Sequence, residues 1–166
     1  KIYKLADPFV RFYLRYMAPN QTLIRLNTHE NIFRSITQNS LPAYWGLSFE
    51  QLCEDAYREI HATVKLSLTD IISVGPYFQQ MQVGQQGLQI DQLVIRRDHV
   101  WMLFEYKFST HPIGIEVIDA IEQKIHRLAK PSNISFEKVL VAANGITSAL
   151  AKRKYFTHVL NLKDLI

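Results

Sequence analysis

Three charged residues interrupt a stretch that otherwise has the pattern of two apolar β-strands. Residues 88–96 and 100–108 are rich in β-branched and aromatic side chains, yet Asp91 lies in the first and Glu105 and Lys107 lie in the second. Burying an ionised group in an apolar layer is costly unless the group is paired, hydrogen-bonded or bound to a metal. A cation site is the simplest explanation, so this hairpin constrains both the fold and the function.

The register of the hairpin decides whether the charges meet. A three-residue turn at Arg97-Asp98-His99 matches the apolar faces of the two strands and places Asp91 opposite Glu105. A two-residue turn at Asp98-His99 would scatter the two acids to opposite faces. The matched faces favour the three-residue turn, with Lys107 one strand step beyond the acids.

This arrangement suits a divalent cation. Like charges at that distance are destabilising unless something neutralises them, and Mg²⁺ prefers carboxylates, a backbone carbonyl and waters. Lys107 could then orient a water nucleophile or stabilise charge on a phosphate. The alternative is that Asp91 and Glu105 are solvated on an exposed sheet face and that Lys107 forms a surface ion pair.

The order of the elements predicts an α/β fold. With 166 residues, 48% of them hydrophobic and 20% charged, the chain can bury a real core. We expect an N-terminal helical segment over residues 1–45 that packs on a core domain over residues 46–166, with Leu41-Pro42 closing the second helix and the third starting after Gly46. The expected elements are three helices and then β-β-β-α-β-α-β, which indicates a mixed sheet flanked by helices. The first helix is expected to begin at residue 8, and further helices are expected at 29–38, 48–63, 114–129 and 148–153. Strands are expected at 71–82, 88–96, 100–108, 139–143 and 159–162.

Composition narrows the class of protein. No apolar run approaches the ~20 residues that cross a bilayer, and no signal peptide is recognisable, so we expect a cytoplasmic protein without a membrane partner. The single cysteine, Cys53, lies in an apolar helical pattern and is expected to be a buried structural thiol, and no Cys/His spacing is typical of zinc. A net charge of +4 and a pI near 9.2 are compatible with nucleic acid.

The spacing Asp91-x13-Glu105-x-Lys107, in a hairpin followed by a helix, resembles the PD-(D/E)XK nuclease superfamily. The resemblance implies a restriction-endonuclease-like mixed central sheet flanked by helices. It also implies that Asp91 and Glu105 bind a metal and that Lys107 is the catalytic lysine. Glu50 matches the acid that many members carry on the helix before the first strand. Ile90 stands where the name of the superfamily implies a proline.

Three further segments resemble one branch of that superfamily, the nuclease-like C-terminal domain of archaeal-type P-loop ATPases. They are Tyr3-Lys4-Leu5-Ala6-Asp7-Pro8-Phe9-Val10-Arg11-Phe12, Tyr44-x-Gly46-x-x-Phe49-Glu50-x-x-Cys53 and Gln89-Ile90-Asp91…Glu105-Tyr106-Lys107-Phe108. The resemblance implies that an ATPase core and a winged-helix segment precede this chain, which fits a start at Lys1. No Gly-rich phosphate loop occurs here.

The predicted function is therefore hydrolysis of phosphodiesters in DNA with Mg²⁺ or Mn²⁺. Asp91, Glu105, the backbone carbonyl of Tyr106 and Glu50 would hold the metal, and Lys107 would position the attacking water. The alternative is a catalytically silent domain of a larger ATPase that binds DNA or a protein; the oligomeric state stays open. Two groups of residues are predicted with less weight. Gln123 and Lys124 would support the site, and the nucleic-acid contacts would be Arg96, Arg97, Lys152, Arg153 and Lys154.

Overall fold

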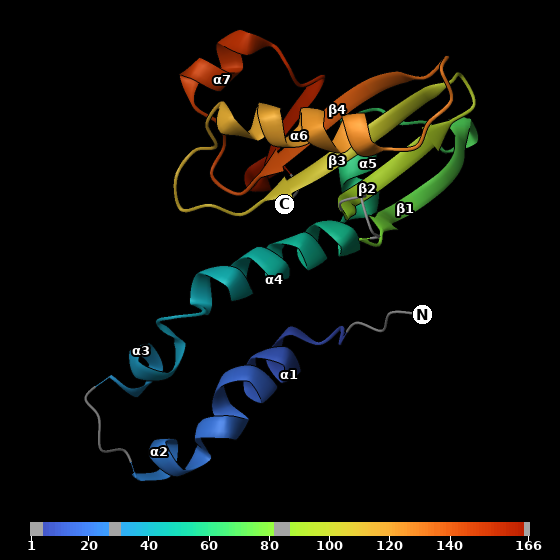
Figure 1. Cartoon of the computed structure of the whole chain (residues 1–166). Coiled ribbons are helices and arrows are strands. Elements are labelled where there is room, and N and C mark those ends of the chain that lie inside the picture. The colour runs from blue at the N-terminus through green and yellow to red at the C-terminus, as the bar shows by residue number, and fades with distance from the viewer. Residues whose placement is uncertain (1–4, 27–30, 82–86, 165–166) are drawn as a thin grey trace. The chain divides into compact units, whose positions relative to one another are not determined.

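The computed structural model describes residues 5–26, 31–81 and 87–164, and the chain divides into two compact units, Lys1–Ser48 and Phe49–Ile166. Figure 1 shows the helices and strands of both units. Within the described ranges, no helix combines the length and the apolar composition that a membrane span needs.

The first unit is helical. Asp7 caps the first helix by accepting a hydrogen bond from the backbone N–H of Val10 (2.8 Å), and Pro8 occupies the first turn, as the sequence predicts. An aromatic cluster of Phe12, Tyr16 and Tyr44 holds the unit together, and the Tyr44 hydroxyl donates to the Pro8 carbonyl at 3.0 Å. Its elements are α1 (Pro8–Phe12), a π-helical turn (Tyr13–Met17), a 3₁₀ turn (Ala18–Asn20), α2 (Gln21–Leu26), α3 (Ile32–Thr37) and the first part of α4 (Leu41–Asp55).

The start of α4 corrects one expectation. Leu41-Pro42 was expected to close the preceding helix, and the next helix was expected to begin after Gly46; instead α4 begins at Leu41 and runs through Gly46 to Asp55. Proline is tolerated in the first turn of a helix because its missing N–H would have no helical partner there. The same dipeptide can therefore end one helix or begin the next.

The second unit is built on a five-stranded mixed sheet. The strand order is β1-β2-β3-β4-β5; the β1–β2 and β2–β3 pairs are antiparallel, and the β3–β4 and β4–β5 pairs are parallel. This confirms the expected α/β class, a mixed sheet flanked by helices with a helical segment before it. The strands are β1 (Ile71–Gln79), β2 (Leu88–Arg96), β3 (Val100–Lys107), β4 (Ser135–Ala142) and β5 (His158–Asn161), and the helices are α5 (Tyr57–Thr63), α6 (Glu116–Arg127) and α7 (Ser148–Arg153), with 3₁₀ turns at Leu68–Asp70 and Leu162–Asp164.

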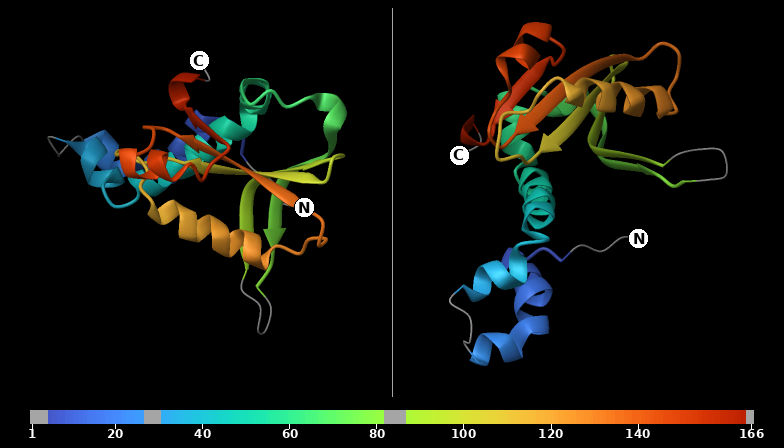
Figure 2. Two further views of the ribbon diagram at one scale, coloured as in Figure 1. Left: turned by 90° about the horizontal axis from the view of Figure 1, so that it is seen from above. Right: turned by 60° about the vertical axis from the view of Figure 1, so that its left-hand side comes forward.

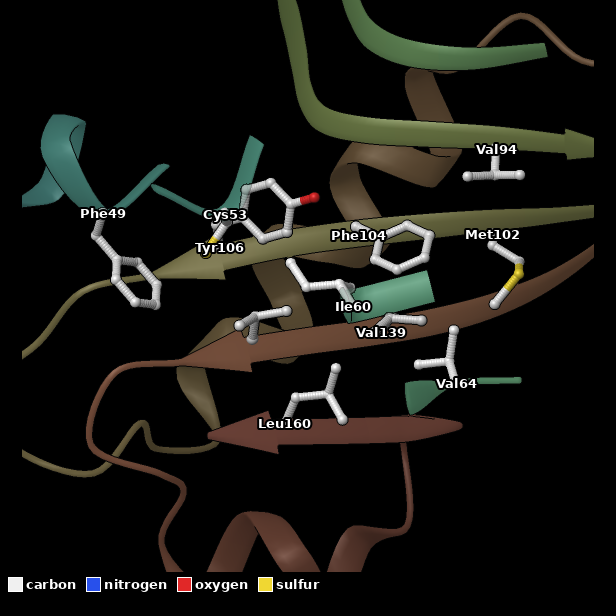
Figure 3. Close-up of a cluster of buried hydrophobic side chains, with 11 residues drawn as sticks. Phe49, Cys53, Ile60, Val64, Val94, Met102, Phe104, Tyr106, Val139 and Leu160 are labelled. Carbon is white, nitrogen blue, oxygen red and sulfur yellow. The ribbon is translucent and has the colours of Figure 1, made fainter. Parts of the chain in front are cut away.

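Helices cover both faces of this sheet, and α5 and α6 lie on opposite sides of it (Figure 2). On one face, residues of α4 and α5 pack against the even-numbered side chains of β3; Figure 3 shows Phe49, Cys53 and Ile60 against Phe104 and Tyr106. The other face packs against α6 and α7 through Leu93, Leu103, Val117, Ile121, Leu140 and Leu150. Strand alternation therefore places the odd-numbered residues of β3, including Glu105 and Lys107, on the α6 face.

The hairpin register agrees with the prediction. Leu93 pairs with Leu103 and Ile95 with Trp101, and the turn consists of the three residues 97–99. The last of them, His99, has φ of 63°, the left-handed conformation that a three-residue hairpin loop uses at this position.

At Asp91 the second strand departs from regular pairing. The β2–β3 ladder ends at Gln92–Phe104, and the β1–β2 register shifts between Gly75–Leu93 and Tyr77–Ile90. In the described part of the chain, the backbone of β3 after Phe104 thus has no ladder partner on its β2 side, and Asp91 lies at the point where the two strands separate.

Candidate active site

Glu105 is a buried carboxylate held by two lysines. Its side chain is 1% exposed; Lys107 Nζ lies 2.7 Å from Oε1 and Lys124 Nζ lies 2.6 Å from Oε2. A carboxylate so deep in the protein requires compensating charge, because its desolvation is costly. The alternative interpretation, in which the acids are solvated on an exposed sheet face, does not apply to Glu105.

Lys124 reaches Glu105 because of its place on α6. It lies three residues after Ile121 and four before Leu128, both buried, so helical periodicity turns it toward the sheet. From the sequence, Lys124 was predicted only to support the site, together with Gln123. The place of Lys124 inside the apolar stripe of this helix is the signal in the sequence that would have given it more weight.

Asp91 makes a different contact. Its Oδ2 accepts a hydrogen bond from the backbone N–H of Tyr106 at 2.8 Å, and so satisfies a β3 group that the ended ladder leaves without a strand partner. Burial, the charge of Glu105 and, more weakly, the charge of Glu50 raise the pKa of Asp91 to about 6; the Tyr106 hydrogen bond and Lys124 act in the opposite direction. The two acids are therefore electrostatically coupled.

The backbone carbonyl of Tyr106 faces the same side as Asp91. The Lys107 carbonyl accepts from Ala143 N–H at 3.0 Å, on the β4 side of β3, and backbone groups of successive strand residues point to opposite sides. The N–H and C=O of Tyr106 consequently point toward β2, where Asp91 takes the N–H. The carbonyl is thus placed to serve as a further oxygen ligand next to the Asp91 carboxylate.

Glu50 and Lys107 belong to the same electrostatic group. Burial acts to lower the pKa of Lys107, but the charges of Glu105, Asp91 and Glu50 outweigh it and the pKa lies above its usual value, so Lys107 is an ammonium at neutral pH. Burial, Asp91 and Glu50 also raise the pKa of Cys53 to about 12. Cys53 is buried, as predicted, and remains a neutral thiol without nucleophilic character.

Some candidates from the sequence do not join this group. Gln123 is exposed and accepts a hydrogen bond from Arg127 at 3.4 Å. Arg96 and Arg97 lie at the turn end of the hairpin, while Lys107 ends β3 at the opposite end, about 25 Å away for a strand of this length.

The basic residues of the turn and of α7 have other surroundings. Arg96 pairs with Asp98 and Glu137, and Arg97 donates to the carbonyl of Thr69 at 3.1 Å. In α7 and its cap, Lys152, Arg153 and Lys154 are all exposed.

The donor set fits one divalent ion of the Mg²⁺ type. Mg²⁺ is commonly bound by one or two carboxylates plus waters, and Asp91, Glu105 and the Tyr106 carbonyl are hard oxygen donors. In the described part of the chain, no three Asp, Glu, His or Cys side chains are grouped so as to hold a metal by themselves, so the carbonyl and waters would have to complete the coordination. Glu105 Oε1 is buried and has no aligned hydrogen-bond donor among the described residues, which leaves it able to bind a cation once Lys107 shifts from it.

Comparison with known proteins assigns the chain to a family. The model of DUF234, described as archaeal and bacterial proteins of unknown function, matches residues 13–124, which include Asp91, Glu105, Lys107 and Lys124. The chain belongs to this family. A search of curated proteins found no match.

Two solved structures are similar in part. A repair endonuclease from Pyrococcus abyssi has 13% sequence identity and a TM-score of 0.43 over 68% of this chain and 44% of its own. A complex of EndoMS with double-stranded DNA has 14% identity and a TM-score of 0.38 over 64% of this chain and 44% of its own. The chain spans less than half the length of either structure.

Proposed function

We propose that this domain hydrolyses phosphodiester bonds in DNA with a divalent metal ion, Mg²⁺ or Mn²⁺, in the manner of a PD-(D/E)XK nuclease. The observation that carries the proposal is the buried Glu105 between two lysines, coupled electrostatically to Asp91 where β2 leaves β3. Phosphodiester hydrolysis needs a cation to neutralise phosphate charge and a positioned group beside the attacking water. Carboxylates and lysines gathered at one strand end are suited to both tasks.

Each residue has a task that follows from its contacts. Asp91, Glu105 and the Tyr106 carbonyl would hold the metal, which when bound supplies Lewis-acid activation of water and phosphate. Glu50 would support this set through its charge. Lys107, 40% exposed and fully protonated, would orient the attacking water or the scissile phosphate. Lys124 would hold Glu105 in place from α6.

The electrostatics favour cation binding. Burial is the largest cause of the raised pKa of Asp91, and the negative charges of Glu105 and, more weakly, Glu50 raise it further. A divalent cation beside Asp91 would lower that pKa again and favour the ionised form. Binding of a divalent cation where β2 and β3 separate would thus stabilise the ionised carboxylates.

Plasmid nicking tests the proposal directly. Supercoiled DNA is incubated with the chain and Mg²⁺ or Mn²⁺, and Asp91→Asn, Glu105→Gln and Lys107→Met are each expected to reduce nicking by about 100-fold or more, as expected when metal or water positioning is lost. Glu137→Gln is the matched control, because this carboxylate pairs with Arg96 at the turn end of the hairpin. Nicking that persists equally in all three variants would overturn the proposal.

The second candidate is a catalytically silent domain that binds DNA or a protein. Two observations favour it: both oxygens of Glu105 already have an ammonium neighbour, and the helical unit carries the net charge of the chain. Residues 1–48 contain six Lys and Arg against two Asp and Glu, whereas residues 49–166 contain thirteen of each. DNA binding without metal-dependent nicking in the wild type would favour this candidate.

The wider setting rests on sequence resemblance alone. We propose that the domain works in the cytoplasm with an N-terminal ATPase region of the same polypeptide. Coupling would appear as an ATP-dependent change in DNA nicking or binding when the ATPase region is supplied. An identical result with and without that region would remove this part of the proposal.

A further inference from the structure

A polar cavity of about 450 Å³ opens at the carboxyl ends of β4 and β5. Among the described residues that line it, Asn144, Asn161 and Lys163 are polar, and Gly145 lies in the same loop as Asn144. Among the described residues, none that lines the cavity carries a side-chain carboxylate. Two carboxamides and one ammonium suit an anionic ligand that also accepts hydrogen bonds.

The cavity adjoins the carboxyl end of the strand that carries Lys107. Lys107 is in register with Ala142 of β4, and Ala142 is in register with Asn161 of β5. Neighbouring strands lie about 4.8 Å apart, so Asn161 is about 10 Å from Lys107 across the sheet edge. The carboxyl ends of parallel strands are also where α/β proteins commonly bind their ligands.

The loop that forms the cavity is held at several points. Asn144 Nδ2 donates to the Ser109 carbonyl at 2.5 Å, and Ile113 N–H donates to the Gly145 carbonyl at 2.9 Å. Gly145 has φ of 71°, and a Cβ there would come within 2.9 Å of Asn161 Oδ1. The cavity wall is therefore fixed by backbone geometry that only glycine adopts without strain.

Asp164, the acid next to Lys163 in the sequence, binds a backbone group. Asp164 Oδ2 accepts a hydrogen bond from the backbone N–H of Asn161 at 2.7 Å, which fixes the exit of β5. Asp164 is not among the residues that line the cavity. Lys163 therefore contributes a positive charge to a wall whose described residues include no Asp or Glu.

We propose that this cavity binds the sugar-phosphate of the nucleotide next to the scissile phosphate, so that a DNA strand crosses the carboxyl ends of β3, β4 and β5. The inference rests on the proposed nuclease function, because it takes Lys107 as the position of the scissile phosphate. Lys163 pairs with the phosphate, and Asn161 donates to it or to the sugar. The cavity thus selects a strand that continues past the cleavage point over a terminal phosphate.

Binding without chemistry tests the inference. The anisotropy of a labelled DNA oligonucleotide is titrated with the full chain in EDTA, so that cleavage plays no part in the signal. Lys163→Gln is expected to raise Kd about three- to tenfold and to reduce the slope of log K against log salt by about one, as for the loss of one phosphate contact. Asn161→Ala is expected to weaken binding to a smaller extent, and Lys163→Arg to restore it.

The control is Lys130→Gln, which removes the same charge before β4 begins, at the opposite end of the sheet. Thermal unfolding confirms that each variant is folded. An unchanged Kd for Lys163→Gln, or an equal rise for Lys130→Gln, would overturn the inference. Wild-type chain that binds in this way but does not nick plasmid with Mg²⁺ would overturn the nuclease proposal and leave the phosphate contact standing.

Discussion

Lys124 Nζ lies 2.6 Å from Glu105 Oε2 and so joins the last turn of α6 to a carboxylate that is only 1% exposed. The contact crosses the boundary between a helix and the sheet face beneath it, among apolar residues on both sides. It fixes the carboxylate from one side while Lys107 approaches from the other. Stability and activity are therefore expected to depend differently on the two lysines.

Replacing Lys124 is expected to destabilise the fold. Lys124→Met leaves Glu105 with a single partner in a buried site, and we expect the free energy of unfolding to fall by about 2–3 kcal/mol near pH 7.5. Urea denaturation measures this loss. Arg127→Met on the exposed side of α6 is the control; an equal loss there would show that the Glu105 contact contributes little.

Replacing Lys107 is expected to affect activity more than stability. Lys107 is 40% exposed, so solvent already screens its ion pair, and we expect Lys107→Met to cost about 1 kcal/mol or less in the free energy of unfolding. Under the proposed function the same change abolishes nicking. A Lys107→Met variant that unfolds as easily as Lys124→Met would contradict this division.

The pKa of Asp91 predicts a pH dependence of stability. The folded-state pKa of about 6 lies above the ordinary 3.8, so the native state binds more protons between these values and the free energy of unfolding falls as pH rises through this window. Asp91→Asn removes the effect, and we expect it to be more stable than wild type by about 1–3 kcal/mol near pH 7.5. Near pH 4 the two proteins should unfold at closely similar urea concentrations, and a constant difference at both pH values would argue against the raised pKa.

Metal binding is expected to offset the loss of stability that ionised Asp91 causes near pH 7.5. Mg²⁺ at about 10 to 100 times its Kd should stabilise the wild type by about 1–3 kcal/mol near pH 7.5 through binding to the native state. Asp91→Asn and Glu105→Gln should lose this gain. The measurement is Tm by calorimetry with and without Mg²⁺, with Glu137→Gln as the variant that keeps the response; equal gains in all variants would indicate binding elsewhere.

The hairpin turn offers a test of the backbone. His99 has φ of 63°, a conformation in which glycine carries no steric penalty. We expect His99→Gly to change the free energy of unfolding by less than about 1 kcal/mol, whereas His99→Val should destabilise by more because a β-branched residue is strained there. Urea denaturation of both variants decides; equal stability of the two would contradict the turn geometry.

Local patterns were enough to predict most of the second unit. The hairpin register followed from matching apolar faces, since a slip of one residue would have exposed every core side chain of β2. The strand at 88–96 and the helix at 148–153 were predicted with their observed ends because turn residues and caps flank them. The helical unit was harder: Leu41-Pro42 is compatible with either the end or the start of a helix, and packing decided between them.

The sequence predicted which residues form the candidate site better than it predicted the contacts between them. Asp91, Glu105 and Lys107 stood out because charge is rare in apolar strands. Which lysine binds which oxygen depends on distances across the sheet and on the tilt of α6, and sequence spacing carries neither. Lys124 therefore received too little weight, although its place between Ile121 and Leu128 was visible in the sequence.

By itself the sequence determined the class of fold, the pairing of the hairpin and the presence of acids and lysines near one strand end, because these follow from periodicity along single elements. Only the tertiary structure decided that β2 leaves β3 at Asp91, that the Tyr106 N–H turns to that carboxylate, and that α6 brings Lys124 to Glu105. The physical reason is that a buried charge is stabilised by partners from other elements. Their arrival depends on how the helices pack on the sheet.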